Sequence, residues 1–266
     1  MLDTATIHAI ADIVVGAQDG AYTIQKFTDA YPEMTLEDSY AVQDELLRRW
    51  QARGRKLAGM KAGLTSKAKM EQMGVHVPSF GILMNDTLDP DMGVVPMDTL
   101  IHPRVEAEIA FVMKDDLSGP DVSIETIIAA TDFVQPAVEI IDSRFKKFKF
   151  DLVSVVADNG SSARFVMGGR ARRPQELSLD TIGIVFEKNG EVVATASSAA
   201  VLGHPVRAIQ MLVAWLHERG RTLPAGAIVL TGGATEAVAV APGDFISARF
   251  QDLGTVSFRM GQKDAA

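Results

Sequence analysis

The spacing of apolar residues in the first fifth of the chain predicts helices. A helix begins after Thr35, which can cap it. Acids follow in its first turn, and apolar residues recur at helical spacing up to Trp50. Gly54 follows as a stop signal. Because residues 1–53 are mostly helical in pattern, we expect residues 1–55 to form a helical cap on a β-rich body.

Alternation with a period of two predicts a strand from Val105 onward. One face would carry the carboxylates of Glu106 and Glu108, and the other face would carry Val105, Ala107, Ile109 and Phe111. A strand with one wet face explains this pattern. The alternative is a site in which a cation lies between the two carboxylates, since neighbouring carboxylates repel.

The remaining chain reads as strands with few helices. Asn189-Gly190 between two apolar runs is a strong hairpin signal. We expect strands at residues 56–65, 153–157, 182–187, 191–195, 227–230, 245–250 and 255–260, and short strands broken by prolines within 82–101. We expect helices at residues 66–73, 124–130 and from His204-Pro205 to Gly220, and a turn at 77–81.

Composition limits the classes of function. The 266 residues carry a net charge of −8, which argues against general affinity for nucleic acid or anionic membranes. No apolar run reaches the roughly 20 residues of a membrane span, and the N-terminus lacks a signal-peptide pattern, so we expect a cytoplasmic protein. Since there is no cysteine, any metal is held by oxygen or imidazole ligands, and oxygen favours Mg²⁺ or Mn²⁺.

Two charged residues interrupt apolar segments. Lys61 lies in Leu57–Leu64, where it must extend its ammonium to solvent, pair with an acid or lose its proton. Glu139 lies in an apolar strand-like run, where an ion pair is the ordinary explanation and a metal ligand the alternative. Together with Glu106 and Glu108 they would form three carboxylates and one lysine. Three ligands on an octahedral ion leave positions that suit a 2-oxo acid.

Two polar turns are weaker candidates for a binding site. Asp158–Ser162 offers side-chain oxygens and amides to a small ligand, and Thr231-Gly232-Gly233 offers bare backbone. Each also fits an ordinary surface loop. The chain has neither G-x-G-x-x-G nor a P-loop, so nothing points to a nucleotide.

Several segments together resemble the fumarylacetoacetate hydrolase superfamily, in its branch of 2-oxo-acid hydratases and decarboxylases of aromatic meta-cleavage pathways. The resemblance covers almost the whole chain. Its marks are Lys61–Ser66, Val105–Glu108, Val138–Arg144, Ala157–Asn159 and Leu202–Pro205. It implies an α+β fold, a mixed β-sandwich roll with a helical N-terminal cap, with residues 56–266 forming the catalytic roll.

The resemblance also implies roles for particular residues. Glu106, Glu108 and Glu139 would bind Mg²⁺ or Mn²⁺, and Lys61 would be catalytic. The further residues expected to bind substrate are Leu64, Thr65, Ser79, Asn159, Ser161 and Thr231.

Within the branch, the decarboxylases are the closer match. The segments Tyr31–Thr35, Phe148–Val156 and Thr231–Gly233 are similar to them, whereas the hydratases usually carry an acid where this chain has Ser79. The implied reaction converts 2-oxo-3-hexenedioate, a 2-oxo dicarboxylic acid, to 2-hydroxypenta-2,4-dienoate and CO₂. Electrons from the lost carboxylate would run through the C=C bond to the carbonyl.

Two other functions stay open at this point. The chain could hydrate 2-hydroxypenta-2,4-dienoate with the same fold, or it could act as a non-catalytic scaffold for a partner hydratase. The resemblance implies a complex with the 2-hydroxypentadienoate hydratase, so decarboxylation and a scaffold role are compatible. The sequence leaves a homo-oligomer open, and it does not determine the choice between Mg²⁺ and Mn²⁺, the upstream aromatic pathway or the pocket for the distal carboxylate.

Overall fold

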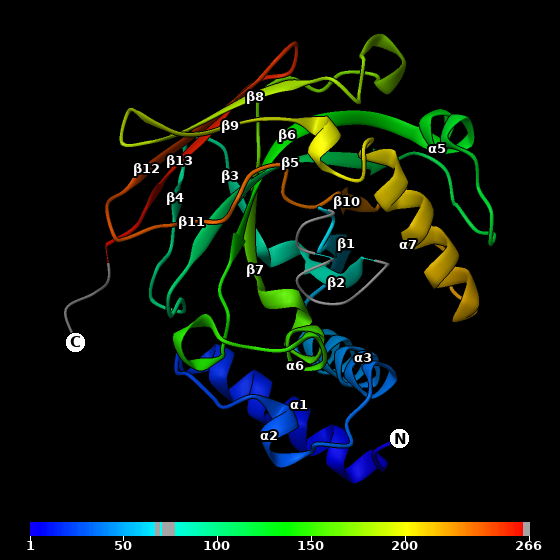
Figure 1. Ribbon diagram of the computed structural model, residues 1–266, viewed down its shortest axis with the longest axis vertical. Coiled ribbons are helices and arrows are strands. Elements are labelled where there is room, and N and C mark those ends of the chain that lie inside the picture. The colour runs from blue at the N-terminus through cyan, green and yellow to red at the C-terminus, as the bar shows by residue number, and fades with distance from the viewer. Residues whose placement is uncertain (67–69, 71–77, 263–266) are drawn as a thin grey trace.

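Two curled β-sheets pack against each other, with the N-terminal helices at one end and a long C-terminal helix along one side (Figure 1). The structure is a computed structural model that describes residues 1–66, 70 and 78–262. Of the helix expected over residues 66–73, only residues 66 and 70 are described. Residue 77, the first of the expected turn, also lies outside the described residues. The mixed helix-and-sheet architecture with a helical N-terminal region confirms the predicted fold class.

The larger sheet has eight strands in the order β2-β1-β10-β5-β6-β7-β3, with β11 also paired to β5. Its centre is the long antiparallel pair β5–β6. The strands are β1 (Leu57–Gly63), β2 (Ser79–Met84), β3 (Leu88–Pro90), β5 (Arg104–Met113), β6 (Thr131–Ile141), β7 (Ser162–Met167), β10 (Ile228–Leu230) and β11 (Val238–Ala239).

The smaller sheet has five strands in the order β4-β13-β12-β8-β9. The predicted hairpin is confirmed: Asn189 and Gly190 both have positive φ, as a two-residue turn of this kind requires. The strands are β4 (Val94–Val95), β8 (Gly183–Lys188), β9 (Glu191–Ser197), β12 (Phe245–Phe250) and β13 (Gly254–Met260).

The helix predicted from Thr35 is confirmed. Thr35 and Asp38 form a reciprocal capping box at its start. Gln43 then ties this helix to the roll, because its buried amide donates to the carbonyls of Phe80 and Val156. The described helices are α1 (Thr4–Asp19), α2 (Phe27–Ala30), α3 (Leu36–Ala52), α5 (Ile124–Ala130), α6 (Leu152–Ala157) and α7 (Val206–Glu218).

Two local predictions were wrong. Residues 153–157 form helix α6 instead of a strand, because Asp151 caps the segment by accepting a hydrogen bond from the Ser154 amide. A short apolar run does not distinguish a buried helix from a strand. Ser79 to Gly81 belong to strand β2 instead of a turn, because β2 pairs with β1 along its full length.

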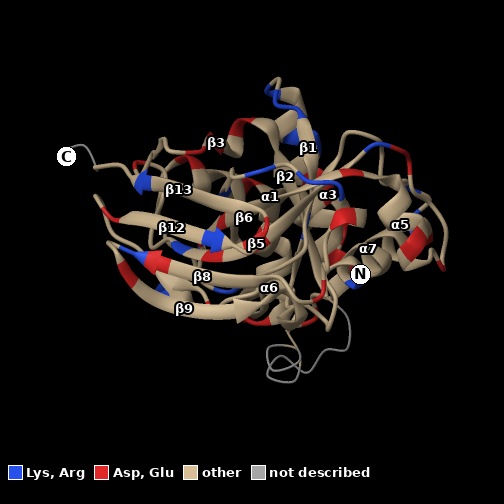
Figure 2. Ribbon diagram, turned by 90° about the horizontal axis from the view of Figure 1, so that it is seen from above, with Lys and Arg blue, Asp and Glu red and all other residues tan. Residues whose placement is uncertain are grey.

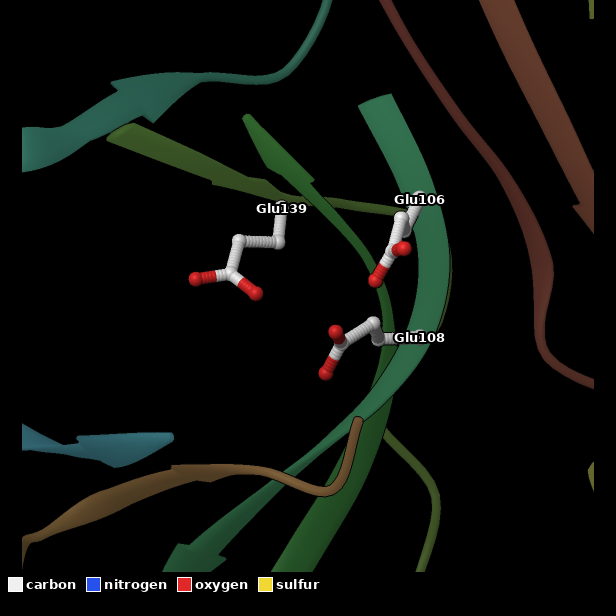
Figure 3. Close-up of side chains that lie close together, drawn as sticks. All are labelled: Glu106, Glu108 and Glu139. Carbon is white, nitrogen blue, oxygen red and sulfur yellow. The ribbon is translucent and has the colours of Figure 1, made fainter. Parts of the chain in front are cut away.

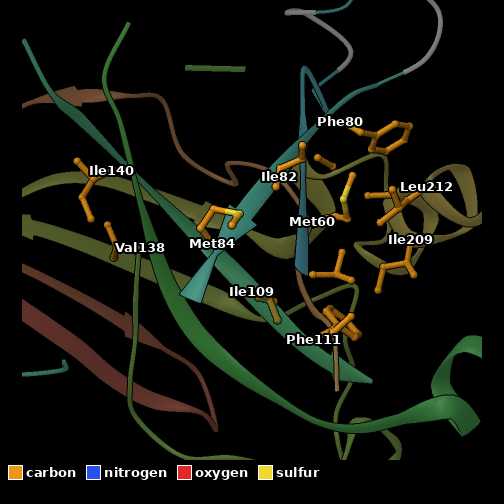
Figure 4. Packing of buried hydrophobic residues seen from close by; sticks show 14 of the residues in the cluster. Met60, Phe80, Ile82, Met84, Ile109, Phe111, Val138, Ile140, Ile209 and Leu212 are labelled. Atoms are coloured by element: carbon orange, nitrogen blue, oxygen red, sulfur yellow. The ribbon is translucent and has the colours of Figure 1, made fainter. Parts of the chain in front are cut away.

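The main hydrophobic core joins residues of the larger sheet to residues of the helices and of the smaller sheet, and Figure 4 shows part of it. Ile209 and Leu212 of α7 pack beside Met60 and Phe111 of the sheet. Alternation along β5 sends Phe111 and the other odd-numbered residues to this core. The even-numbered residues therefore face the opposite side of the sheet, where the candidate site lies.

The outside of the fold carries acidic and basic residues interspersed along the chain (Figure 2). Among the described residues, no helix is both long and apolar enough to cross a membrane. The division into a cap of residues 1–55 and a roll of residues 56–266 stays a prediction.

Candidate metal and substrate site

Strand register brings three glutamates together on the concave face of the larger sheet. Glu106 of β5 lies directly opposite Glu139 of β6, and Glu108 is on the same face as Glu106. Each glutamate offers an oxygen, and these oxygens lie within 4.8 Å of one another. Figure 3 shows the three carboxylates converging. All three residues are buried, so this face of the strand is not wet.

Lys61 approaches the cluster from strand β1. Its ammonium lies 2.8 Å from Oε2 of Glu139 and 3.4 Å from the carbonyl oxygen of Gly160. The residue is only 4% exposed, so its charge is paired with acids and does not reach solvent. Of the three fates that the sequence allowed for this lysine, pairing with an acid is the one observed.

The cluster has more acceptors than the described part of the protein satisfies. Oε1 of Glu108 and Oε1 of Glu139 are buried and have no hydrogen-bond partner among the described residues. Buried carboxylate oxygens left in this state are costly, unless a cation completes the site. An all-oxygen set of converging carboxylates fits a hard divalent ion such as Mg²⁺ or Mn²⁺.

The electrostatics of the cluster agree with this fit. Burial raises the pKa of Glu108 well above its usual range, and the charge of Glu139 raises it further. Burial also raises the pKa of Glu139, although Lys61 opposes the shift. Burial lowers the pKa of Lys61, but the three glutamates outweigh burial, so the pKa is raised overall and the ammonium keeps its proton.

The loop Thr231-Gly232-Gly233 contacts the carboxylates of the glutamate cluster. The Gly232 amide donates to Oε2 of Glu108 at 2.7 Å. Gly232 has φ of +101°, and a Cβ on Gly233 would lie 2.4 Å from Oε2 of Glu106. Glycine is required here because the backbone passes too close to the glutamates for a side chain. The bare backbone foreseen from the sequence therefore contacts the acidic cluster.

A small apolar cluster closes the concave face beyond the glutamates. In the strand register, Ala137 lies opposite Glu108 and Phe165 lies opposite Glu139. The cluster consists of Leu83, Ala110, Ala137, Phe165 and Leu230. It excludes water from one side of the carboxylates, which strengthens the electrostatic interactions among the charged groups.

A cavity of about 630 Å³ lies next to the glutamate cluster, and Glu106 is part of its lining. Three of the residues expected to bind substrate line it: Leu64, Ser79 and Ser161. The buried hydroxyl of Ser161 has no hydrogen-bond partner among the described residues, so it is free to bind a ligand. The described residues that line the cavity are Lys61, Gly63, Leu64, Ser79, Arg104, Glu106, Ile141, Phe148, Lys149, Phe150, Val155, Gly160, Ser161 and Ala237.

Three other expected substrate-binding residues do not line this cavity. Asn159 uses its side chain to bridge the backbone N–H and C=O of Ile82, which holds the 159–161 turn against β2. The Thr231 hydroxyl donates to the Ile109 carbonyl. Thr65 is buried against Gly232.

Sequence reasoning missed several residues that line the cavity, above all Arg104 and Phe148. A signal for Arg104 was present, because the alternation that places Glu106 and Glu108 on one face places Arg104 there as well.

Comparisons with known proteins place the chain in a family. Residues 59–260 match the model of the fumarylacetoacetate hydrolase C-terminal domain. The chain belongs to the fumarylacetoacetate hydrolase family. It is 52% identical to 4-oxalocrotonate decarboxylase from Pseudomonas putida over 258 residues, which cover 97% of this chain and 98% of that enzyme.

A more distant relative has another reaction in its name. The chain is 36% identical to 2-hydroxyhexa-2,4-dienoate hydratase from Comamonas testosteroni, over 97% of this chain and 99% of that protein. A solved structure of 4-oxalocrotonate decarboxylase from Pseudomonas putida G7, complexed with magnesium and adipate, superimposes with a TM-score of 0.96 at 51% identity. It covers 98% of this chain and 99% of that one.

Proposed function

We propose that this protein is a carboxy-lyase that decarboxylates 2-oxo-3-hexenedioate (4-oxalocrotonate) to 2-hydroxypenta-2,4-dienoate and CO₂, with Mg²⁺ or Mn²⁺ as cofactor. The observation that carries the proposal is the 52% identity to a decarboxylase of this name over nearly the full length of both chains. The site agrees with it: a buried acidic cluster, a protonated lysine and a cavity meet at one place. The magnesium and adipate bound by the solved relative support a hard cation and a six-carbon dicarboxylate.

Glu106, Glu108 and Glu139 would hold the divalent ion. When bound, this ion would act as a Lewis acid on the C1 carboxylate and C2 carbonyl of the substrate and stabilise the charge that develops there. The raised pKa values of Glu108 and Glu139 mean that binding such an ion displaces protons.

Lys61 would act on the enolate oxygen. As the C5–C6 bond breaks, the C6 carboxylate leaves as CO₂ and its electron pair moves through the C3=C4 bond to the C2 oxygen. The Lys61 ammonium, held in place by Glu139, would neutralise that oxygen or protonate it to the dienol. Burial beside the small apolar cluster makes this charge interaction stronger than it would be in water.

Ser161, Ser79 and Leu64 would orient the substrate within the cavity. Asn159 and Thr231 would hold the backbone around the site through their hydrogen bonds to Ile82 and Ile109. Thr65 would support it by packing against Gly232.

Lys61→Met tests the proposal most directly. We expect kcat to fall roughly 100-fold or more. The Mg²⁺-dependent rise in melting temperature should persist, because the three carboxylates remain. The matched control is Lys56→Met, which removes an exposed lysine outside the cavity and should leave kcat unchanged. An unchanged kcat in Lys61→Met would contradict the role of this lysine.

The hydratase reaction is the second candidate, since hydratases are among the relatives at 36% identity. Two assays on protein stripped with EDTA separate the two reactions: CO₂ release from 2-oxo-3-hexenedioate and consumption of 2-hydroxypenta-2,4-dienoate, each with and without Mg²⁺. Metal-dependent CO₂ release establishes the decarboxylase. Metal-dependent consumption of the dienoate without CO₂ release assigns the chain to the hydratases.

We further propose that the enzyme works in the cytoplasm in a complex with the 2-hydroxypentadienoate hydratase, which would consume the unstable dienol. A homo-oligomer is the other assembly that we propose to test. Size-exclusion chromatography with light scattering, on the chain alone and mixed with the hydratase, measures both.

A further inference from the structure

The cavity lining also carries two basic residues, Arg104 and Lys149. Arg104 precedes Glu106 by two residues on β5, so the two side chains leave the same face of the strand. At a rise of about 3.4 Å per residue their Cα atoms lie about 7 Å apart. Both residues line the cavity, as does Lys149 from the segment that follows β6.

The guanidinium of Arg104 is held in place but is not neutralised. Its Cζ atom lies 4.5 Å from the centroid of the Phe148 ring. Arg104 forms no ion pair with any described acid, unlike Arg144 and Arg164, which pair with Asp158 and Asp89. A half-buried, stacked and uncompensated guanidinium is suited to binding a carboxylate through two parallel hydrogen bonds.

The backbone under the Arg104 stack is unusual. Lys147 and Phe148 both have φ of +57°, a left-handed conformation that is rare for a bulky residue. The Phe148 ring packs against His102 and Phe150, with centroids 5.3 and 5.7 Å away. Local strain of this kind persists only where the surroundings hold it, and here it places the ring beneath the guanidinium.

The charge balance of the cavity points to a dianion. Among the described groups of the metal end, a divalent ion and the Lys61 ammonium would offset the charges of the three glutamates. Arg104 and Lys149, which form no ion pair with any described acid, then add two positive charges to the described part of the cavity wall. A monocarboxylate would neutralise one of them, and a dicarboxylate would neutralise both.

We propose that Arg104, positioned by Phe148, binds the carboxylate at the far end of a dicarboxylic substrate and makes the cavity selective for dicarboxylates over monocarboxylates. This inference rests on the proposed function, because it assumes that the 2-oxo end lies at the acidic cluster. Lys149 is exposed, and its charge adds to the attraction for a dianion.

The interaction has a kinetic consequence. The far carboxylate loses its charge as CO₂ departs, so its attraction to Arg104 is stronger in the ground state than in the transition state. Arg104 therefore contributes to KM and to specificity, and does not contribute to kcat. The apolar wall of Phe150, Val155 and Ile141 favours the neutral CO₂ that forms.

Two unreactive ligands test the inference: 2-oxoadipate, a six-carbon 2-oxo dicarboxylate, and 2-oxohexanoate, which lacks the far carboxylate. Their affinities for the Mg²⁺-loaded enzyme are measured by calorimetry. We expect the unmodified enzyme to bind 2-oxoadipate about 10- to 100-fold more tightly than 2-oxohexanoate. In Arg104→Met that preference should disappear, through loss of affinity for 2-oxoadipate alone.

Three further variants control for structural effects. Arg173→Met removes an exposed arginine outside the cavity and should keep the preference. Arg104→Lys should keep part of it, because the charge remains but the planar fork is lost. Phe148→Leu should reduce the preference less than Arg104→Met, since the guanidinium remains but loses its stacking partner. In turnover, Arg104→Met should raise KM roughly tenfold or more without lowering kcat.

Other outcomes overturn the inference. If Arg104→Met weakens both ligands equally, Arg104 binds the shared 2-oxo end or acts only on the fold. If it weakens neither, Arg104 does not bind substrate. Because the binding measurement needs no turnover, a retained preference for 2-oxoadipate in a protein that releases no CO₂ would count against the proposed reaction and leave the specificity of Arg104 standing.

Discussion

Two buried ionic clusters lie close together in this protein, and they are built in opposite ways. In the first, Arg144 donates to the carboxylate of Asp158, to its carbonyl at 2.6 Å and to the Asp142 carbonyl. The Arg144 amide adds a hydrogen bond to the same carboxylate. In the second, Lys61 faces Glu106, Glu108 and Glu139, and carboxylate oxygens stay unpaired among the described residues.

The difference separates structure from function. Asp158 is fully buried, and burial raises its pKa to about 6 even though Arg144 opposes the shift, but every charged group of that pair has a partner. This pair ties the C-terminal end of α6, where Asp158 lies, to the segment that follows β6, where Arg144 lies. Among the described residues, the glutamate cluster carries more negative charge than one lysine offsets, which supports our proposal that it binds a cation and that it costs stability until one binds.

The largest expected effect is on activity, in Glu108→Gln. We expect activity to fall about 1000-fold, because the proposed metal site loses a charged ligand. The metal-free protein should melt at the same temperature or about 2 °C higher, since a buried unpaired charge is removed and the glutamine oxygen can still accept from the Gly232 amide. CO₂ release and differential scanning calorimetry measure the two effects. A clear drop in melting temperature would mean that Glu108 is a structural residue.

Arg144→Met should behave in the opposite way. It leaves Asp158 buried without its cation, so we expect the free energy of unfolding to fall by about 3–5 kcal/mol. Urea denaturation of the metal-free protein measures it, with Arg173→Met as the exposed control that should change stability by less than about 0.5 kcal/mol. A loss no larger than that of the control would remove the contrast between the two clusters.

The next effect is a dependence of metal stabilisation on pH. Glu108 and Glu139 have raised folded-state pKa values, so their protonated forms favour the folded state, and that stability is lost as pH rises through the raised values. Lys61 has a raised pKa and stays protonated in this range, so its contribution is constant. The rise in melting temperature caused by Mg²⁺ should therefore be larger at about pH 8 than at about pH 6.

Calorimetric scans with Mg²⁺ and with EDTA at each pH measure this difference. In Glu108→Gln the pH dependence should shrink, because one of the titrating groups is gone. If Mg²⁺ raises the melting temperature equally at both pH values, Mg²⁺ and protons do not compete for Glu108 and Glu139, which would contradict the proposed metal site.

The smallest effect compares two buried serines. The Ser154 hydroxyl accepts from the Phe27 amide, whereas the Ser161 hydroxyl has no partner among the described residues. Ser154→Ala should cost about 1–2 kcal/mol of stability and leave KM unchanged. Ser161→Ala should cost less than about 0.5 kcal/mol and raise KM several-fold, because only the ligand would use that hydroxyl. Equal losses of stability would place both hydroxyls in the fold.

The sequence predicted most of the elements and one part of the site. Alternation placed Glu106 and Glu108 on one face of a strand, and Asn189-Gly190 located a hairpin. Both signals are local, so they can be read from neighbouring residues. The segment at 153–157 failed because its apolar run is too short to show a period, and the Asp151 cap determined the outcome.

What the sequence by itself determined about this protein is the chemistry of its parts: unpaired charges inside apolar strands, oxygen ligands without sulfur, and glycines where backbone must pass closely. Only the tertiary structure decided how those parts meet. The β5–β6 register sets Glu139 opposite Glu106, and the folding of β1 and of the segment after β6 around that pair brings Lys61 within 2.8 Å of Glu139 and places Phe148 beneath Arg104. Such contacts join residues far apart in the chain, and their geometry follows from strand pairing and sheet curvature, which no local pattern encodes.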